Sequence, residues 1–196
     1  MTEKKYNIIY ADPPWQQKAG RKLGSYKKVN GIQVWDSQET VTQNLPYETM
    51  TVDEISLLPV KNLTCKDAFL FIWVTNKYLL ESQKVINSWG FKYVACITWK
   101  KKKMGGGLGG VVRICSEHLL FCRKGSLKAT GNISESVIDA KRPYVNGYPC
   151  HSKKPDVFYN LIEGVYSGER LELFARNKRI GWDSWGNEID SDIKIG

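Results

Sequence analysis

The chain has 196 residues, enough for one domain with a substantial core, and 42% hydrophobic with 25% charged residues is typical of a soluble globular protein. Its 29 basic and 20 acidic residues give a formal net charge of +9, which favours a polyanionic partner such as nucleic acid. Five cysteines without a CxxC pair argue against a disulfide framework or a zinc site, and we expect no metal. We see neither a signal peptide nor a long apolar stretch, which predicts a cytoplasmic protein without a membrane span.

The first apolar run, residues 6–11, predicts a strand buried on both faces of a parallel sheet. It ends in Asp12, two prolines and Trp15, although a turn needs one proline at most. From Gln16 to about Asn44 the chain is polar and basic, and we expect a long loop without secondary structure that is either functional or disordered.

Strands and helices then alternate. Thr51 and Glu54 form a capping box that predicts the start of a helix, and Pro59 marks its end. Further strands are expected over 68–74, 93–99, 117–125 and 170–176, and further helices over 76–90 and 154–165. In the helix over 76–90 the apolar positions are Leu79, Leu80, Val85, Ile86 and Trp89, with Gly90 as its stop. This alternation predicts an α/β fold with a mainly parallel sheet, in a single domain over residues 1–196.

Ligands of such sheets bind beyond the carboxyl ends of the strands, where Asp12 and Arg176 are expected. Asp12 and the carbonyl of Pro13 could accept the two N–H groups of an exocyclic amine on a nucleobase. The prolines have no N–H to compete, and Trp15 or a nearby tyrosine could stack on the ring. The alternative is a plain Asp-Pro-Pro turn beside a core tryptophan.

The motif DPPW after an apolar strand resembles the adenine-amino methyltransferases of the methyltransferase-A seventy-kilodalton type, which act on messenger RNA or DNA. The resemblance runs from about Asn7 to Ile189, and its blocks follow in the order of that family. They are LPYETMTVDEI, AFLFIWVTN, WGFKYVACITWKK, EHLLFCRKG, HSKKPDVFYNLIE, RLELFAR and WGNEI.

The resemblance implies a Rossmann-like methyltransferase, with a twisted sheet, helices on both faces and a permuted motif order. It implies S-adenosylmethionine as the cofactor and adenine N6 as the acceptor. The implied catalytic residues are Asp12, Pro13, Pro14 and Trp15; the implied cofactor-binding residues are Asp12, Pro13, Ser152, Lys154, Phe174, Arg176, Asn187 and Glu188. Tyr47 matches an aromatic residue near the mouth of the pocket.

Two segments, 16–44 and 100–113, are expected to face the nucleic acid. Their basic residues Lys18, Arg21, Lys22, Lys102 and Arg113 are candidates for substrate binding. The run GGGLGG at 105–110 is not followed by the helix that a phosphate-binding glycine loop needs, so it is not interpreted as a dinucleotide site.

The sequence favours DNA over RNA as substrate, because a small chain of this type without appended domains is more like the bacterial and phage branch. Three alternatives stay open: an RNA adenosine methyltransferase, a non-catalytic nucleic-acid-binding partner of an active paralogue, and an enzyme acting on cytosine or a protein amide. A homodimer or a paralogous partner subunit also stays open.

Overall fold

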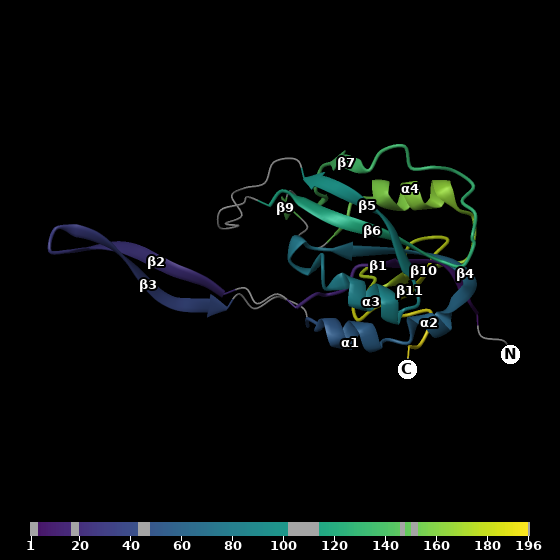
Figure 1. The fold of residues 1–196 in the computed structure, drawn as a ribbon, viewed down its shortest axis with the longest axis horizontal. Coiled ribbons are helices and arrows are strands. Elements are labelled where there is room, and N and C mark those ends of the chain that lie inside the picture. Colours follow the sequence, from purple (N-terminus) through teal and green to yellow (C-terminus); the bar gives the residue numbers. More distant parts are fainter. Residues whose placement is uncertain are drawn as a thin grey trace.

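The computed structural model describes residues 4–16, 20–42, 48–101, 114–145, 148–149 and 153–195. Within them, seven strands form one twisted sheet in the order β11-β10-β1-β4-β6-β5-β7 (Figure 1). The strands of this sheet are β1 (Tyr6–Ala11), β4 (Thr64–Val74), β5 (Lys92–Lys101), β6 (Ser116–Lys124), β7 (Val137–Ala140), β10 (Arg170–Leu173) and β11 (Asp183–Trp185). The helices are α1 (Val52–Leu57), α2 (Val60–Leu63), η1 (Asn76–Tyr78), α3 (Ser82–Ser88) and α4 (Val157–Val165). Two short strands, β8 (Tyr144–Val145) and β9 (Tyr148–Pro149), pair with each other.

The sheet is mainly parallel, as the sequence predicts. Strand β1 pairs in parallel with β10 on one side and β4 on the other, and β11 continues the parallel set beyond β10. Strand β6 runs antiparallel to both of its neighbours, β4 and β5. Because β1 is covered on both faces, Ile8 and Ile9 are both fully buried although their side chains point to opposite sides.

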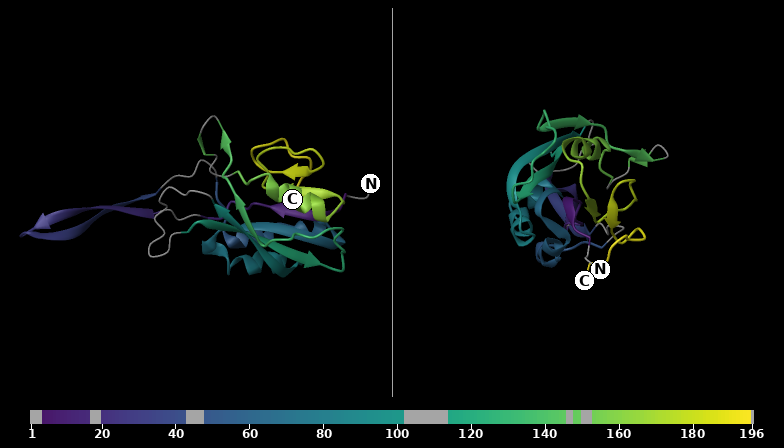
Figure 2. Two further views of the ribbon diagram at one scale, coloured as in Figure 1. Left: turned by 90° about the horizontal axis from the view of Figure 1, so that it is seen from above. Right: turned by 90° about the vertical axis from the view of Figure 1, so that its right-hand side faces the viewer.

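Helices cover both faces of the sheet (Figures 1 and 2). One core joins Ile55, Val60 and Trp89 from the α1–α3 layer to the sheet, and a second joins Phe158 and Ile162 of α4 to the opposite face. The expected Rossmann-like α/β fold is therefore confirmed. In the described part of the chain no helix is long and apolar enough to cross a membrane.

The helix predictions hold with changed boundaries. Thr51 and Glu54 form the expected capping box: the Glu54 carboxylate accepts from the Thr51 backbone N–H at 2.7 Å. The prediction of one helix over 76–90 is wrong at its start, because η1 and a turn precede α3 and leave the side chain of Leu80 85% exposed. Val85 and Ile86 are buried as expected, and Gly90 ends the helix at φ +82°.

The expectation that residues 16–44 form a structureless loop is wrong for residues 20–42. They form an antiparallel hairpin of β2 (Gly20–Val29) and β3 (Ile32–Thr42), which projects from the body (Figure 1). Asn30 and Gly31 close it with φ angles of +51° and +83°, as a two-residue hairpin turn of type I′ requires. A ribbon outside the core lacks the alternation of apolar and polar residues by which most strands are recognised in a sequence. The Asn30-Gly31 pair, which is typical of a two-residue hairpin turn, was therefore the one local pattern in this segment that indicated a hairpin.

Gly186 directly follows β11 and packs closely against Ala175, which follows β10. A Cβ at this position would lie 2.1 Å from the backbone oxygen of Ala175, a residue whose own N–H donates to the carbonyl of Trp185 at 2.9 Å. We expect Gly186→Ala to lower the free energy of unfolding by about 1–3 kcal/mol. Urea denaturation measures this change.

The matched control is Gly164→Ala in α4, where an added Cβ meets nothing within 4 Å. We expect this variant to be neutral or to gain up to about 1 kcal/mol from helix propensity. Equal stability of the two variants would contradict the close packing at Gly186.

Candidate active site

The candidate site lies where β1 and β10 end. Ala11 pairs with Leu173 in the parallel register, so Asp12 and Phe174 leave the sheet side by side. Two cavities of about 450 and 410 Å³ open at this place. Both are lined by Asp12, Phe174, Arg176 and Glu188, so Asp12 lies between two spaces large enough for separate ligand groups.

Charged side chains of alternating sign hold Asp12 in place. Its carboxylate accepts a hydrogen bond from the Lys154 ammonium at 2.7 Å, and Glu117 lies 3.5 Å from the same ammonium. Glu117 in turn pairs with Lys101. The side chain of Lys154 is only 13% exposed and lies over the ring of Trp73. Removing one member of such a buried pair typically costs about 3–5 kcal/mol, because it leaves an uncompensated charge.

The pKa values of this pair follow from burial and from these charges. Burial by itself lowers the pKa of Lys154, but the charges of Asp12 and Glu117 outweigh it and raise that pKa above its ordinary value. Burial raises the pKa of Asp12, and the Lys154 ammonium offsets this only in part. Lys154 is therefore a permanent cation, and Asp12 is a stronger hydrogen-bond acceptor than an ordinary exposed aspartate.

The DPPW segment is fixed by its own backbone and by Met50. The N–H of Trp15 donates to the carbonyl of Pro13 at 2.8 Å, and the N–H of Met50 donates to the carbonyl of Pro14 at 2.8 Å. A carbonyl oxygen has two lone pairs, so Pro13 keeps one for a ligand. The expected acceptor role of Pro13 thus stays a prediction that the geometry permits.

Trp15 packs in the core instead of presenting an open ring. Only 4% of it is exposed, its indole N–H donates to the carbonyl of Trp73 at 2.8 Å, and its ring stacks on Tyr78. Stacking of this indole on a base is therefore not supported by its position. The geometry gives Trp15 the role of locking the segment that carries Asp12.

Glu172 lies inside strand β10 and lines the larger of these two cavities. One carboxylate oxygen accepts from the hydroxyl of Tyr159 at 2.7 Å; the other is buried without a hydrogen-bond partner among the described residues. Burial raises the pKa of Glu172 to about 7. In the sequence, an acidic residue within an otherwise apolar strand is the pattern that indicates a ligand-binding role for this position.

The segment after β10 is under backbone strain. Phe174 has a φ of +63°, which costs of order 1–3 kcal/mol for a residue other than glycine. The ring of Phe174 packs against Trp185. Two residues further along the chain, the guanidinium of Arg176 lies 3.3 Å from the carboxylate of Glu188. Asn187 lines the smaller cavity, so the structure brings four of the predicted cofactor-binding residues of the C-terminal blocks to one place.

Several predicted site residues cannot be placed. Tyr47, Lys18, Lys102, Arg113 and Ser152 lie outside the described residues. Arg21 and Lys22 belong to β2, of which the backbone is described, and therefore stand on the projecting hairpin.

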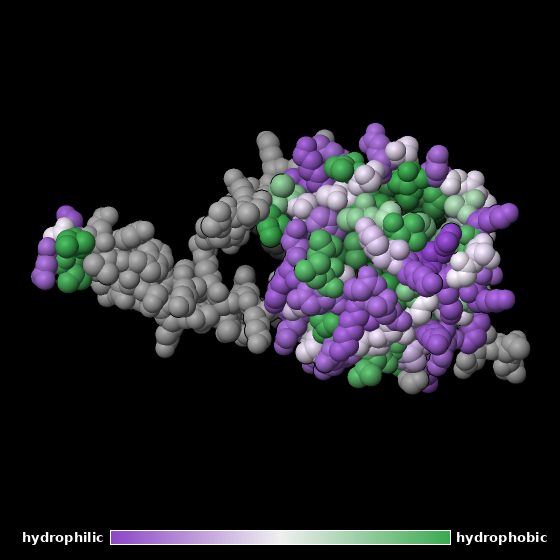
Figure 3. Space-filling view, in the orientation of Figure 1, coloured by the Kyte–Doolittle hydropathy of each residue, from purple (hydrophilic) through white to green (hydrophobic). Residues whose placement is uncertain are grey.

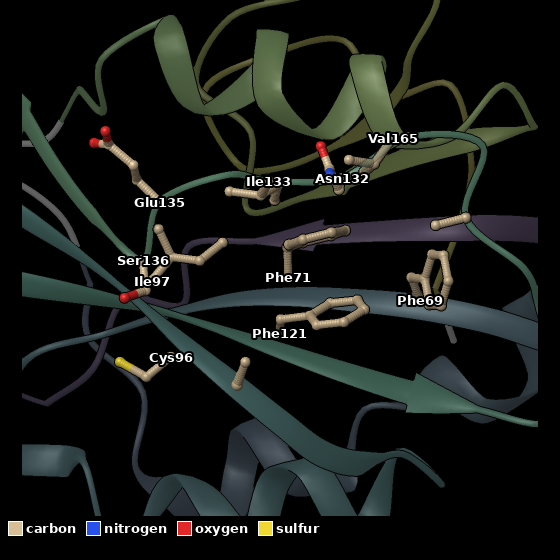
Figure 4. Close-up of a pocket in the computed structure, with 13 residues that line it drawn as sticks. Phe69, Phe71, Cys96, Ile97, Phe121, Asn132, Ile133, Glu135, Ser136 and Val165 are labelled. Carbon is tan, nitrogen blue, oxygen red and sulfur yellow. The ribbon is translucent and has the colours of Figure 1, made fainter.

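A third cavity, of about 250 Å³, is separate from this site. It lies between the sheet and residues 129–136, and Figure 4 shows the rings of Phe69, Phe71 and Phe121 around it. Its lining includes no residue of the DPPW or LELFAR motifs. It is too apolar to hold a charged methyl donor.

Comparison with known proteins agrees with the geometry. The MT-A70 family model matches residues 6–188. The chain is 30% identical to the type II methyltransferase M.MunI of a Mycoplasma species, over 100% of this chain and 83% of that protein. It is 33% identical to the N(6)-adenosine-methyltransferase MT-A70-like protein of Arabidopsis thaliana and 29% identical to the N(6)-adenosine-methyltransferase catalytic subunit METTL3 of Homo sapiens. These matches cover 94% and 95% of this chain but only 24% and 28% of the two longer proteins.

The raised pKa of Glu172 predicts a pH dependence of stability. The folded pKa of about 7 lies above the ordinary value of 4.5, so between these pH values the folded chain binds more protons than the unfolded chain. The free energy of unfolding must therefore fall as pH rises through this window, by roughly 3 kcal/mol for this one group.

Glu172→Gln keeps the shape and removes the titration. We expect the stability difference between this variant and the wild type to shift in favour of the variant as pH rises from 5 to 7.5, measured by urea denaturation. Glu81→Gln, at an exposed glutamate, is the control and should follow the wild type. Parallel pH profiles of all three proteins would contradict the assignment.

Proposed function

The chain belongs to the MT-A70 family, and from this membership we propose that it uses S-adenosylmethionine to methylate the N6 amine of adenine in nucleic acid. The observation that carries the proposal is the position of Asp12 between two cavities that share its side chain. A transferase for two substrates needs such an arrangement, because donor and acceptor must meet at one point from different sides.

The residues of the larger cavity fit the charges of this donor. S-adenosylmethionine carries an ammonium and a carboxylate at one end and an adenosine at the other, and it supplies an electrophilic methyl group on a sulfonium. The unpartnered oxygen of Glu172 suits a cation, and Lys154 suits a carboxylate. Glu188, which lines both cavities, and Asn187 of the smaller cavity offer polar groups for the adenosine where the two spaces adjoin.

The acceptor amine would be held by the tip of β1. Asp12 and the free lone pair of the Pro13 carbonyl accept its two N–H groups, which draws the nitrogen out of conjugation and exposes its lone pair. The locked DPPW backbone keeps both acceptors in position without reorganisation. No strong base is needed, because the amine becomes acidic as it is alkylated. A base within a duplex would have to be flipped out to reach this site.

DNA is favoured over RNA as the substrate. The relative named as a type II methyltransferase matches along 83% of its own length, whereas the relatives named as adenosine methyltransferases contain this region as about a quarter of a longer protein. We also propose that residues 1–196 form a single domain.

Nucleoside analysis tests the proposed reaction. The protein is incubated with S-adenosylmethionine and either duplex DNA, single-stranded DNA or RNA, and the digested nucleosides are identified by mass spectrometry. We expect N6-methyladenine, and more of it in DNA than in RNA. Methylated cytosine would overturn the choice of base. No heat of donor binding in calorimetry, together with no methylated product, would instead support a non-catalytic role.

Asp12→Asn tests the role of the carboxylate. The amide keeps the size of the side chain but replaces one acceptor oxygen by a donor, so it repels the acceptor amine. We expect the single-turnover rate to fall on the order of 10²–10³-fold while the donor still binds. Asp53→Asn, at a surface aspartate that pairs with Lys84, is the matched control. Methyl transfer by Asp12→Asn near the wild-type rate would show that the mechanism is wrong.

A further inference from the structure

We propose that the β2–β3 hairpin, residues 20–42, is a DNA-binding arm that lies in the major groove of duplex DNA. This proposal rests on the proposed function for the class of substrate. It concerns binding and not methyl transfer, so the two can fail separately.

The hairpin forms a sheet of its own. In the described structure β2 and β3 pair with each other and with no strand of the central sheet, and the ribbon extends well beyond the body (Figures 1 and 2). Ten residues at about 3.3 Å each make an arm about 33 Å long. A two-stranded ribbon is marginally stable by itself in water, so an arm of this length is a structure that a partner would complete.

The hairpin is rooted at the candidate active site. Residue 16, four positions after Asp12, leads into the arm, and Glu48 follows it; Glu48 lines the smaller cavity. The two sides of the root are joined by backbone hydrogen bonds between Gln16 and Met50 at 2.9 Å and between Met50 and Pro14 at 2.8 Å. A ligand held along the arm would therefore be held beside Asp12.

The composition of the arm favours a polyanion. Residues 20–42 contain four basic residues and two acidic ones, within a chain of net charge +9. Like charge opposes pairing of the arm with a second copy of the chain, whereas phosphates attract it. The basic residues are Arg21, Lys22, Lys27 and Lys28.

The shape of the arm selects the kind of nucleic acid. The major groove of B-form DNA is about 12 Å wide and admits a two-stranded β-ribbon. The major groove of an A-form RNA helix is deep and narrow and does not admit one. A twisted antiparallel ribbon of this length (Figure 1) therefore fits duplex DNA and discriminates against duplex RNA.

The tip carries apolar side chains where solvent alone would favour polar ones. Val29 and Ile32 are register partners on either side of the turn, and they are 53% and 68% exposed. Figure 3 shows hydrophobic and hydrophilic side chains together at this tip. Lys28, next to Val29 in the chain, is exposed. In the major groove such side chains would contact the methyl groups of thymine while the lysine reaches a phosphate.

A shortened arm tests the proposal directly. Gly24 and Ser37 are register partners, so replacing residues 25–36 by Asn-Gly closes a short hairpin on the same root. Binding to a fluorescent DNA duplex longer than two helical turns is measured by anisotropy over a range of salt concentrations. We expect at least a tenfold loss of affinity for duplex DNA and a smaller change for a matched RNA duplex.

A point variant keeps the length of the arm. Lys27→Gln with Lys28→Gln removes two charges, so the slope of log affinity against log salt should decrease by about 2. In both variants thermal unfolding and calorimetric donor binding should match the wild type, which excludes misfolding as the cause.

Three results would overturn the proposal that the hairpin binds duplex DNA. They are duplex DNA affinity within twofold of the wild type in the shortened variant, an equal loss for the RNA duplex, and a wild-type dimer in light scattering that the shortened variant no longer forms. A wild-type protein that binds duplex DNA through the arm but methylates no adenine would instead refute the proposed function alone.

Discussion

The contact between Asp12 and Lys154 is the constraint on which the candidate site depends. It joins the end of the first strand to the segment before α4, far away in sequence, and it places a carboxylate in a half-buried position where burial alone would favour its protonation. Glu117 and Lys101 extend the pair across β6 and β5, so that each buried charge has a partner of opposite sign. The tip of β1 can hold a largely buried carboxylate because this chain of charges compensates its desolvation.

The rest of the site is organised around the same edge of the sheet. The parallel register of β1 and β10 brings Asp12 next to Phe174, whose positive φ redirects the chain towards Arg176, Asn187 and Glu188. Glu172 enters the same cavity from within β10 and retains an oxygen without a partner. Backbone strain and an unsatisfied carboxylate both cost free energy, and Phe174 and Glu172 both line the space that the proposed donor would occupy.

Trp15 fixes the segment from which the hairpin leaves this edge of the sheet. The indole is buried under Tyr78 and held by Trp73, which makes the DPPW segment a rigid root instead of a mobile loop. The chain then leaves the body as a ribbon and returns to Met50 beside the same segment. Substrate contacts far from Asp12 can thus be made by an element whose base is fixed at the reacting position.

The sequence by itself determined the α/β class, the places of the main strands along the chain and the capping box at Thr51, because buried runs and caps are local patterns. Its motifs also singled out Asp12, Lys154 and Arg176 as candidate site residues. Only the tertiary structure decided that Trp15 belongs to the core, that Lys154 pairs with Asp12, and that Leu80 is exposed. It also revealed the ribbon of residues 20–42, whose polar composition resembles a loop. The burial of Trp15 and its contact with Trp73, like the pairing of Lys154 with Asp12, depend on which segments pack together in the fold. The spacing of residues along one chain does not specify contacts between segments that are distant in sequence.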